Sequence, residues 1–132
     1  MTSVDAVASN KKILVVDDDI DIVRLLTQAL SQEGYVVESA SQGSEVLRKT
    51  FEFLPDLILL DVMIPAPDGY HVAREITNDK TLKKKPIIYF ITSRDTFKES
   101  KIMEFAGAAG VIPKPFSMTE IKTLIKGVLS KK

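Results

Sequence analysis

Acidic residues follow two apolar runs of the chain, at positions where carboxylates could act together. Three aspartates at residues 17–19 come directly after the apolar run at residues 13–16, and Asp61 comes directly after the run at residues 57–60. If the runs are neighbouring strands, the carboxylates meet at one edge of a sheet, where roughly 3 kcal/mol opposes each pair about 5 Å apart. Carboxylate oxygens suit Mg²⁺, which often binds phosphate as well. The pattern therefore predicts Mg²⁺-dependent phosphoryl chemistry.

The elements that must position these carboxylates can be read from the alternation of apolar runs with segments of helical spacing. Strands are expected, in chain order, at residues 13–16, 35–38, 57–60, 87–91 and 111–112. Helices are expected over residues 22–30, around 47–54, over 70–78, up to 107 and after 117. Strands that alternate with helices are typical of an α/β fold, and we expect a doubly wound parallel sheet of five strands with helices on both faces.

Individual residues mark where some of these elements begin or end. Gly34 predicts a left-handed stop after the first helix, and Pro55 ends the second. Pro113 cannot donate a hydrogen bond to a neighbouring strand, so the last strand is expected at an edge of the sheet. Ser117 and Glu120 form a capping-box pattern that opens the last helix.

Polar side chains stand at the carboxyl ends of the expected strands, where ligands bind in an open doubly wound sheet. For strand order 2-1-3-4-5, the ligand site lies between the first and third strands, which end in Asp17, Asp18 and Asp61. Thr92 follows the fourth strand, and Lys114 follows the fifth. A hydroxyl and an ammonium are thus expected beside the acidic group.

Composition excludes several other classes of function. The chain has 132 residues, enough for one compact domain, and its 18 basic and 18 acidic residues balance, so no net field attracts nucleic acid or an anionic membrane. Cysteine is absent, which removes thiol chemistry. Three lysines at residues 83–85 are expected to keep a loop solvated. The polar start, residues 1–10, shows no secretion signal, and a cytoplasmic protein is expected.

Four motifs resemble the receiver domain of two-component response regulators, the CheY-like superfamily. They are K-K-I-L-V-V-D-D-D at residues 11–19, P-D-L-I-L-L-D-V-M-I-P-A-P-D-G-Y at 55–70, I-T-S at 91–93 and K-P-F at 114–116. The resemblance spans nearly the whole chain and implies a flavodoxin-like fold. It also implies a flexible tail at residues 1–10 and a receiver domain at residues 11–132.

The resemblance implies that Asp61 accepts a phosphoryl group from a phosphohistidine on a sensor histidine kinase or phosphotransfer protein. The implied Mg²⁺ ligands are Asp17, Asp18, Asp61 and the backbone carbonyl of Met63. Thr92 would hydrogen-bond the phosphoryl oxygen and Lys114 would pair with it, and physical chemistry supports both roles because their polar groups stabilise oxygens that gain charge in the transition state. The Lys114–Pro115 bond is expected to be cis, as in the family.

A receiver of this kind is a phosphoacceptor signalling domain and not an enzyme with a separate substrate. It is expected to bind a downstream target protein through the helix before residue 107, the last strand and the last helix, a face that could also pair two copies of the chain. Direct binding of nucleic acid or membrane is not expected.

Two features leave alternatives open. Strand alternation does not decide which two of the three aspartates turn toward the site; we choose Asp17 and Asp18, and expect Asp19 to cap the first helix. Val111 stands three residues before Lys114, where the family usually has a tyrosine or phenylalanine that swings inward on activation. A smaller or differently placed output signal is expected.

Two other functions remain in competition. A receiver-like module that works without phosphorylation, as an interaction or dimerisation domain, is suggested by Val111. A Mg²⁺-dependent phosphatase with an aspartyl nucleophile commonly places a second acid two residues after the nucleophile, where this chain has Met63. The phosphatase is therefore disfavoured.

Overall fold

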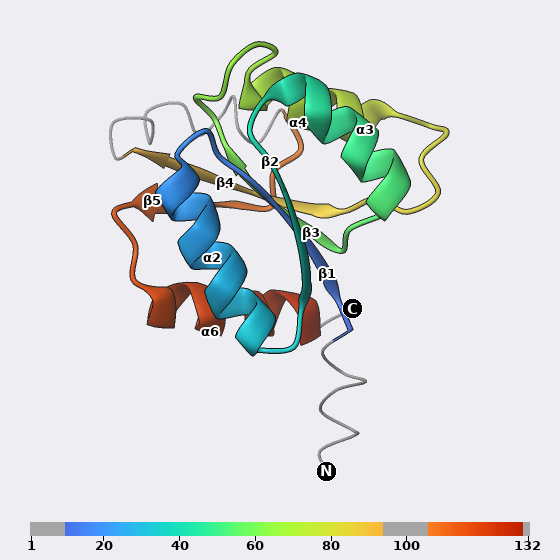
Figure 1. Ribbon diagram of the computed structural model, residues 1–132. Coiled ribbons are helices and arrows are strands. Elements are labelled where there is room, and N and C mark those ends of the chain that lie inside the picture. The colour runs from blue at the N-terminus through green and yellow to red at the C-terminus, as the bar shows by residue number, and fades with distance from the viewer. Residues whose placement is uncertain (1–9, 94–105, 131–132) are drawn as a thin grey trace.

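A computed structural model describes residues 10–93 and 106–130 of the chain. Its elements are β1 (Lys12–Val16), α2 (Ile20–Gln32), β2 (Val36–Ala40), α3 (Gly43–Phe53), β3 (Leu57–Asp61), α4 (Gly69–Asn78), β4 (Ile87–Ser93), β5 (Gly110–Lys114) and α6 (Met118–Ser130). The strands form one parallel sheet in the order β2-β1-β3-β4-β5 (Figure 1). The predicted doubly wound fold and its strand order are confirmed.

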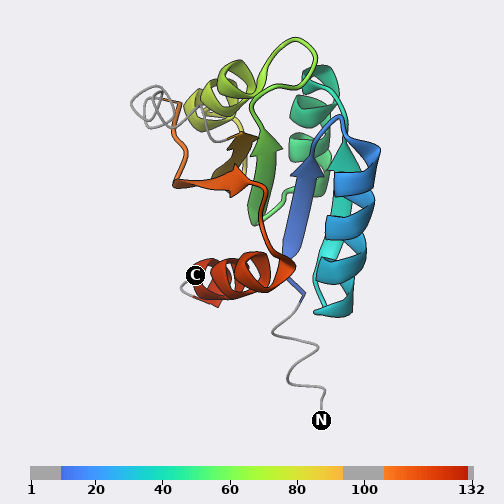
Figure 2. The same ribbon diagram turned by 90° about the vertical axis from the view of Figure 1, so that its left-hand side faces the viewer.

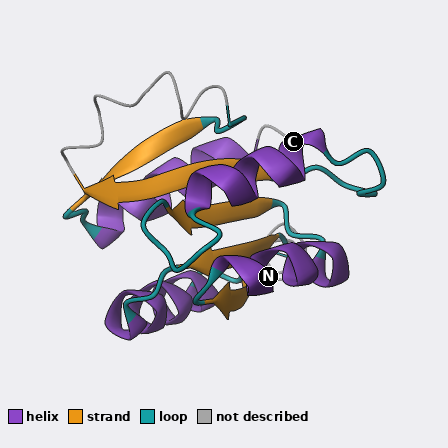
Figure 3. Ribbon diagram, turned by 90° about the horizontal axis from the view of Figure 1, so that it is seen from above, coloured by secondary structure: helices purple, strands orange, loops and turns teal. Residues whose placement is uncertain are grey.

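The sheet is buried on both faces, and the middle residues of its central strands are apolar. Every residue of β3 is buried, and alternate side chains point to opposite faces. Ile58 and Leu60 pack with α3 and α4, whereas Leu57 and Leu59 pack with α2 and α6. Among the described residues, α3 and α4 therefore cover one face of the sheet, and α2 and α6 cover the other (Figure 2 and Figure 3). This arrangement leaves the ends of the strands as the place where polar chemistry can occur.

The helix boundaries follow the signals in the sequence. Asp19 is the N-cap of α2, and its carboxylate accepts hydrogen bonds from the backbone N–H groups of Asp21 and Ile22. Gly34 follows α2 with a φ of 98°, in the left-handed region that favours glycine. Ser117 and Glu120 form the expected capping box before α6, with Oγ to Oε1 at 3.0 Å.

Some strand limits differ from expectation. β2 begins at Val36 instead of residue 35 and continues to Ala40, and β5 begins at Gly110. β4 continues to Ser93 because it pairs with β5 up to Ser93 and Lys114, so Thr92 lies inside the strand rather than after it. β5 is at the edge, as Pro113 predicted.

Two further expectations from the sequence concern the output face and the absence of membrane binding. The helix expected before residue 107 falls mostly on residues 94–105, outside the described part, and with it much of the expected output face. Within residues 10–93 and 106–130, no helix is both long enough and apolar enough to cross a membrane.

Asp56 ties together the starts of three strands, at the edge of the sheet opposite the acidic group. Its carboxylate accepts hydrogen bonds from the backbone N–H of Lys12 at 2.8 Å and from Lys84 Nζ at 3.1 Å. Its own backbone N–H donates to the Lys12 carbonyl, and its carbonyl accepts from the N–H of Ile87. Asp56 is only 8% exposed, so these contacts compensate for the loss of hydration.

The lysines at residues 83–85 therefore do more than keep a loop solvated. Lys84 pairs with Asp56, and Lys85 Nζ donates to the carbonyls of Ile76 and Thr77 at 3.0 and 2.7 Å, near the end of α4. A cation at a helix C-terminus satisfies carbonyls that have no partner within the helix. Both lysines hold the loop after α4 against the rest of the fold.

We expect replacement of Asp56 by asparagine to reduce the free energy of unfolding by about 1–3 kcal/mol at neutral pH, because two donors lose their charged acceptor. Burial would raise the pKa of the Asp56 carboxyl, but the Lys12 N–H and the Lys84 ammonium outweigh it and lower the pKa below 3.8. The carboxylate thus stabilises the fold above that pH, and the stabilisation is lost as pH falls through the lower folded pKa.

Urea unfolding at several pH values tests this expectation. The difference between the native chain and Asp56→Asn should shrink below pH 3.8. Glu38→Gln, an exposed change on β2, serves as the control and should leave stability nearly unchanged. A difference that stays constant across the acid range would contradict the assigned role of Asp56.

Candidate functional site

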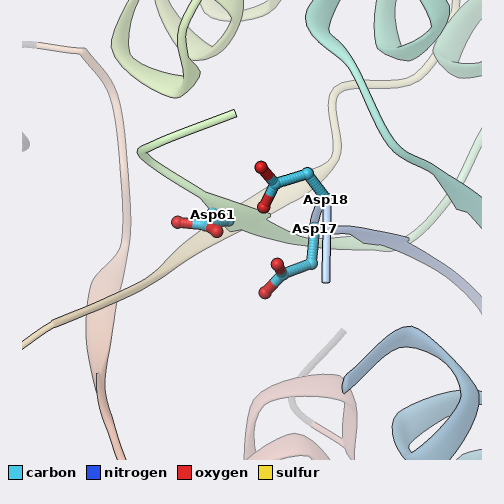
Figure 4. Close-up of side chains that lie close together, drawn as sticks. All are labelled: Asp17, Asp18 and Asp61. Carbon is cyan, nitrogen blue, oxygen red and sulfur yellow. The ribbon is translucent and has the colours of Figure 1, made fainter. Parts of the chain in front are cut away.

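Asp17, Asp18 and Asp61 come together at the carboxyl ends of β1 and β3, which are neighbours in the sheet. Each contributes an oxygen atom to a group in which all the oxygens lie within 4.8 Å of one another. Figure 4 shows the three side chains around one space beyond the strand ends. Asp17 and Asp61 are buried, at 1% and 5% exposure, whereas Asp18 is exposed. The group therefore has a protected base and an open side.

Lys114 is the cation of this group. Its Nζ lies 2.9 Å from Asp17 Oδ2 and 3.3 Å from Asp61 Oδ2. Burial would lower the pKa of Lys114, but the hydrogen bond to Asp17 and the charge of Asp61 outweigh it and raise the pKa. The ammonium is therefore charged at neutral pH and bridges the two buried carboxylates. The Lys114–Pro115 bond is cis, as expected.

The carboxyl group of Asp61 is in an environment that disfavours its charged form. Burial raises the pKa of Asp61, and the neighbouring Asp17 carboxylate raises it further. The N–H of Met63, which donates to Asp61 Oδ1 at 3.0 Å, and the Lys114 ammonium oppose this rise. A further cation at the site would add to that opposition and favour the carboxylate.

Each buried carboxylate uses its two oxygens differently. The Oδ1 atom of Asp17 accepts the backbone N–H of Asp19 at 2.9 Å, just as Asp61 Oδ1 accepts that of Met63. Their Oδ2 atoms face Lys114. The local turns therefore fix both side chains without using the oxygens that face the site.

The three aspartates at residues 17–19 have two different roles. Asp17 and Asp18 contribute to the acidic group, and Asp19 caps α2. The capping role expected for Asp19 is confirmed.

Thr92 is the last residue but one of β4, the strand beside β3, and it is only 1% exposed. Its neighbour Ser93 is level with Lys114 in the β4–β5 pair, which places both strand ends at the same edge of the sheet. Thr92 thus lies on the strand between Asp61 and Lys114.

Val111 is partly buried against the core cluster beneath α3 and α4. In the β4–β5 pair it is level with Phe90, whose ring makes an edge contact with Tyr70 at 5.4 Å between centroids. Aromatic side chains thus lie near this part of the sheet, but they come from β4 and α4 and not from position 111.

Two glycines near the acidic group were not singled out from the sequence. A Cβ atom at Gly69 would lie 2.6 Å from the carbonyl oxygen of Asp61, and one at Gly43 would lie 2.0 Å from the carbonyl oxygen of Pro67. Gly69 follows Asp68, and an Asp-Gly pair is a local signal for a turn. The contact of Gly43 had no local signal, since Gly43 and Pro67 are distant in the chain.

The three carboxylates form a donor set that fits Mg²⁺. All are hard oxygen ligands, one of them faces solvent, and such an ion commonly keeps several waters. Together with Lys114 they retain two formal negative charges, which a divalent cation would neutralise.

A cleft of about 620 Å³ lies elsewhere, between the start of β4 and α6, and its lining includes Ile87, Tyr89 and Leu124.

Comparison with known families matches residues 13–126 to the response regulator receiver domain. PhoP of Bacillus subtilis, an alkaline phosphatase synthesis transcriptional regulatory protein, is 41% identical over 120 residues, which are 91% of this chain and 49% of PhoP. The transcriptional regulatory protein ResD of the same organism is 40% identical over 118 residues, 89% of this chain and 48% of ResD. The chain spans about half the length of these relatives.

Solved structures agree with this match. A CheY-like response regulator receiver domain protein from Methanospirillum hungatei is 30% identical, with a TM-score of 0.84 over 93% of this chain and 96% of that chain. The non-phosphorylated HemR receiver domain from Leptospira biflexa is also 30% identical, with a TM-score of 0.79 over 92% and 95% of the two chains. With the sequence match over residues 13–126 and the sheet order 2-1-3-4-5, these likenesses place the chain in the response regulator receiver domain family.

Proposed function

We propose that the chain accepts a phosphoryl group on Asp61 in a Mg²⁺-dependent reaction and signals through a change in its protein-binding face. The observation that carries the proposal is the position of the Asp61 carboxylate, which is buried and lies beside Asp17, Asp18 and the Lys114 ammonium. Receiver domains are signalling domains that interact with histidine kinases and typically hold Mg²⁺ in an acidic pocket.

The phosphoryl donor is a phosphohistidine on a sensor histidine kinase or phosphotransfer protein. A carboxylate oxygen of Asp61 forms the new bond to phosphorus, the bond between phosphorus and the imidazole nitrogen breaks, and the electron pair stays with the imidazole. The acidic group opens to solvent on the side of Asp18, which allows a partner protein to bring its phosphohistidine to Asp61. Bound Mg²⁺ would offset the negative charge that accumulates among the carboxylates and phosphoryl oxygens.

The residues of the chain divide the remaining work. Asp17, Asp18, Asp61 and the Met63 carbonyl are the proposed Mg²⁺ ligands. Lys114 Nζ, 3.3 Å from Asp61 Oδ2, is within reach of a phosphoryl oxygen attached there. The hydroxyl of Thr92 is proposed to hydrogen-bond the same phosphoryl group. Preorganised donors of this kind stabilise charge as it develops.

The output follows from the added charge. A phosphoryl group brings about 1.5 to 2 negative charges, enough to bias a loop with two arrangements when Lys114 and Thr92 pair with it. The proposed partners are a kinase or phosphotransfer protein and a downstream target protein, in the cytoplasm. The relatives PhoP and ResD are transcriptional regulators. A phosphorylation-independent interaction module is the alternative.

Intact mass after incubation with acetyl phosphate and Mg²⁺ tests the proposal. We expect one phosphoryl adduct that is absent from Asp61→Asn and absent when EDTA removes the metal. Asp21→Asn, an exposed carboxylate in the first turn of α2, should form the adduct as the native chain does. Absence of any adduct, together with no binding of beryllofluoride, would favour the phosphorylation-independent module.

Replacement of Lys114 by glutamine should separate metal binding from phosphoryl transfer. The ammonium competes with Mg²⁺ for Asp17 and Asp61, so its loss should strengthen Mg²⁺ binding in a calorimetric titration. The same change should slow phosphorylation on the order of 10²-fold, because a donor to the developing charge is lost. Lys126→Gln, on the exposed side of α6, is the control. Weaker Mg²⁺ binding in Lys114→Gln would contradict this division of roles.

The absence of an aromatic side chain at position 111 gives a further expectation. If phosphorylation draws Thr92 toward the site, Val111 or the segment after Thr92 must fill the space that Thr92 leaves. We expect either movement to change the surroundings of Val111, so its methyl resonances should shift on phosphorylation. Those of Val128, on α6 and beside the distant cleft, should change little. Complete phosphorylation with unchanged Val111 resonances would refute this expectation.

A further inference from the structure

The corner between β2 and α3 makes backbone hydrogen bonds both to Asp17 and to the loop that follows Asp61. The N–H of Asp17 donates to the carbonyl of Ala40, the last residue of β2, at 3.2 Å. The N–H of Gly43, the first residue of α3, donates to the carbonyl of Pro65, four residues after Asp61, at 3.3 Å. Asp17 and the loop after Asp61 are therefore connected by a second route, besides the direct pairing of β1 with β3.

Gly43 allows this loop to lie closer to α3 than any other residue would. A Cβ atom at position 43 would lie 2.0 Å from the carbonyl oxygen of Pro67 and 2.9 Å from its Cγ atom. The nearer atom belongs to the backbone, so no change of rotamer relieves the overlap. The glycine is thus required by close packing, and a side chain at position 43 must displace the loop or the helix.

The loop has little other support on its outer side. Pro65, Ala66 and Pro67 are all exposed, so burial of these residues does not hold them in place. At its far end, the loop is tied to the phosphoacceptor strand: Gly69 N–H donates to the Val62 carbonyl at 2.9 Å, and Gly69 lies against the backbone of Asp61. A displacement at Pro67 therefore reaches Asp61 and Met63 within a short length of chain.

The corner itself is held by a side chain of α3. The Glu45 carboxylate accepts hydrogen bonds from both the N–H and the Oγ of Ser41, each at 3.1 Å. Glu45 thereby fixes the turn that leads from Ala40 to Gly43. These two hydrogen bonds restrain the turn, and both are exposed to solvent.

We propose that Gly43 is a positioning residue that sets the placement of Asp61 and Met63 relative to Asp17. The role rests on the proposed function of the acidic group, since what Gly43 positions is the proposed phosphoacceptor and its metal ligands. Gly43 touches none of the reacting atoms and acts through the Pro65–Pro67 segment and the Asp17 contact of the same corner.

Gly43→Ala tests the proposal, with Gly127→Ala as the matched control. Both glycines are in helices, but a Cβ atom at Gly127 would meet nothing within 4 Å. In Gly43→Ala, the backbone amide resonances of Met63 and Gly69 should shift. Mg²⁺ affinity should fall on the order of tenfold, as it commonly does when a residue that orients a metal ligand is changed. Phosphorylation by acetyl phosphate at saturating Mg²⁺ should slow by about tenfold or more, because small displacements at a reacting centre have large effects.

Glu45→Ala provides a second variant that introduces no steric overlap and serves if Gly43→Ala does not fold. Removing the support of the corner should weaken Mg²⁺ binding in the same direction but by less. Glu52→Ala removes a glutamate of the same helix whose partner is Arg48, and it should leave Mg²⁺ affinity unchanged. The positioning role would be overturned if Gly43→Ala, or Glu45→Ala in its place, bound Mg²⁺ with the same affinity as the native chain and the control variants.

The outcomes also separate this role from the proposed function. If the native chain binds neither Mg²⁺ nor beryllofluoride, the proposed function fails, and the amide resonances of Met63 and Gly69 still decide whether Gly43 positions the loop. If the native chain is phosphorylated and Gly43→Ala behaves as Gly127→Ala in all three measurements, the proposed function stands and the positioning role fails.

Discussion

The fold places two buried carboxylates of like charge, Asp17 and Asp61, with oxygens within 4.8 Å of each other. Their repulsion is about 3 kcal/mol at an effective dielectric constant near 20, which is a large part of the 5–15 kcal/mol by which domains are typically stable. Lys114 offsets it from β5, across the intervening strand β4. The sheet order therefore matters for electrostatics as well as for packing, because it brings the Lys114 ammonium within reach of both acids.

The parts of the structure that could be predicted are those in which the signal is local. The apolar runs at β1 and β3 identify buried central strands, since burial on both faces removes the need for alternation. Gly34 and the Ser117–Glu120 pair mark helix ends through their own chemistry. The acidic group was predicted because the carboxyl ends of parallel strands share one edge, and the approach of Asp61 to Asp17 follows from that geometry alone.

What could not be predicted depends on contacts between distant residues. The extent of β4 depends on its pairing with β5, which the apolar pattern of residues 87–91 does not contain. Lys84 resembled a solvated charge because its partner, Asp56, is 28 residues away in the chain. The need for glycine at position 43 arises from Pro67, and the order of residues around Gly43 carries no sign of it. The choice of Asp17 and Asp18 over Asp19 came from the family resemblance and from the capping position of Asp19, since alternation alone left it open.

The contacts of Asp56 give the sheet two unlike ends. At one end, the starts of β1, β3 and β4 meet at the buried residue Asp56, whose carboxylate accepts the N–H of Lys12 and whose backbone carbonyl accepts the N–H of Ile87. These strands therefore cannot slide along one another without breaking these hydrogen bonds. At the other end, the carboxylates repel one another and Lys114 offsets this repulsion, so an added negative charge would increase it. Because the strand starts are tied to Asp56, we expect an added charge to displace the loops and helices that follow the strands rather than the register of the strands.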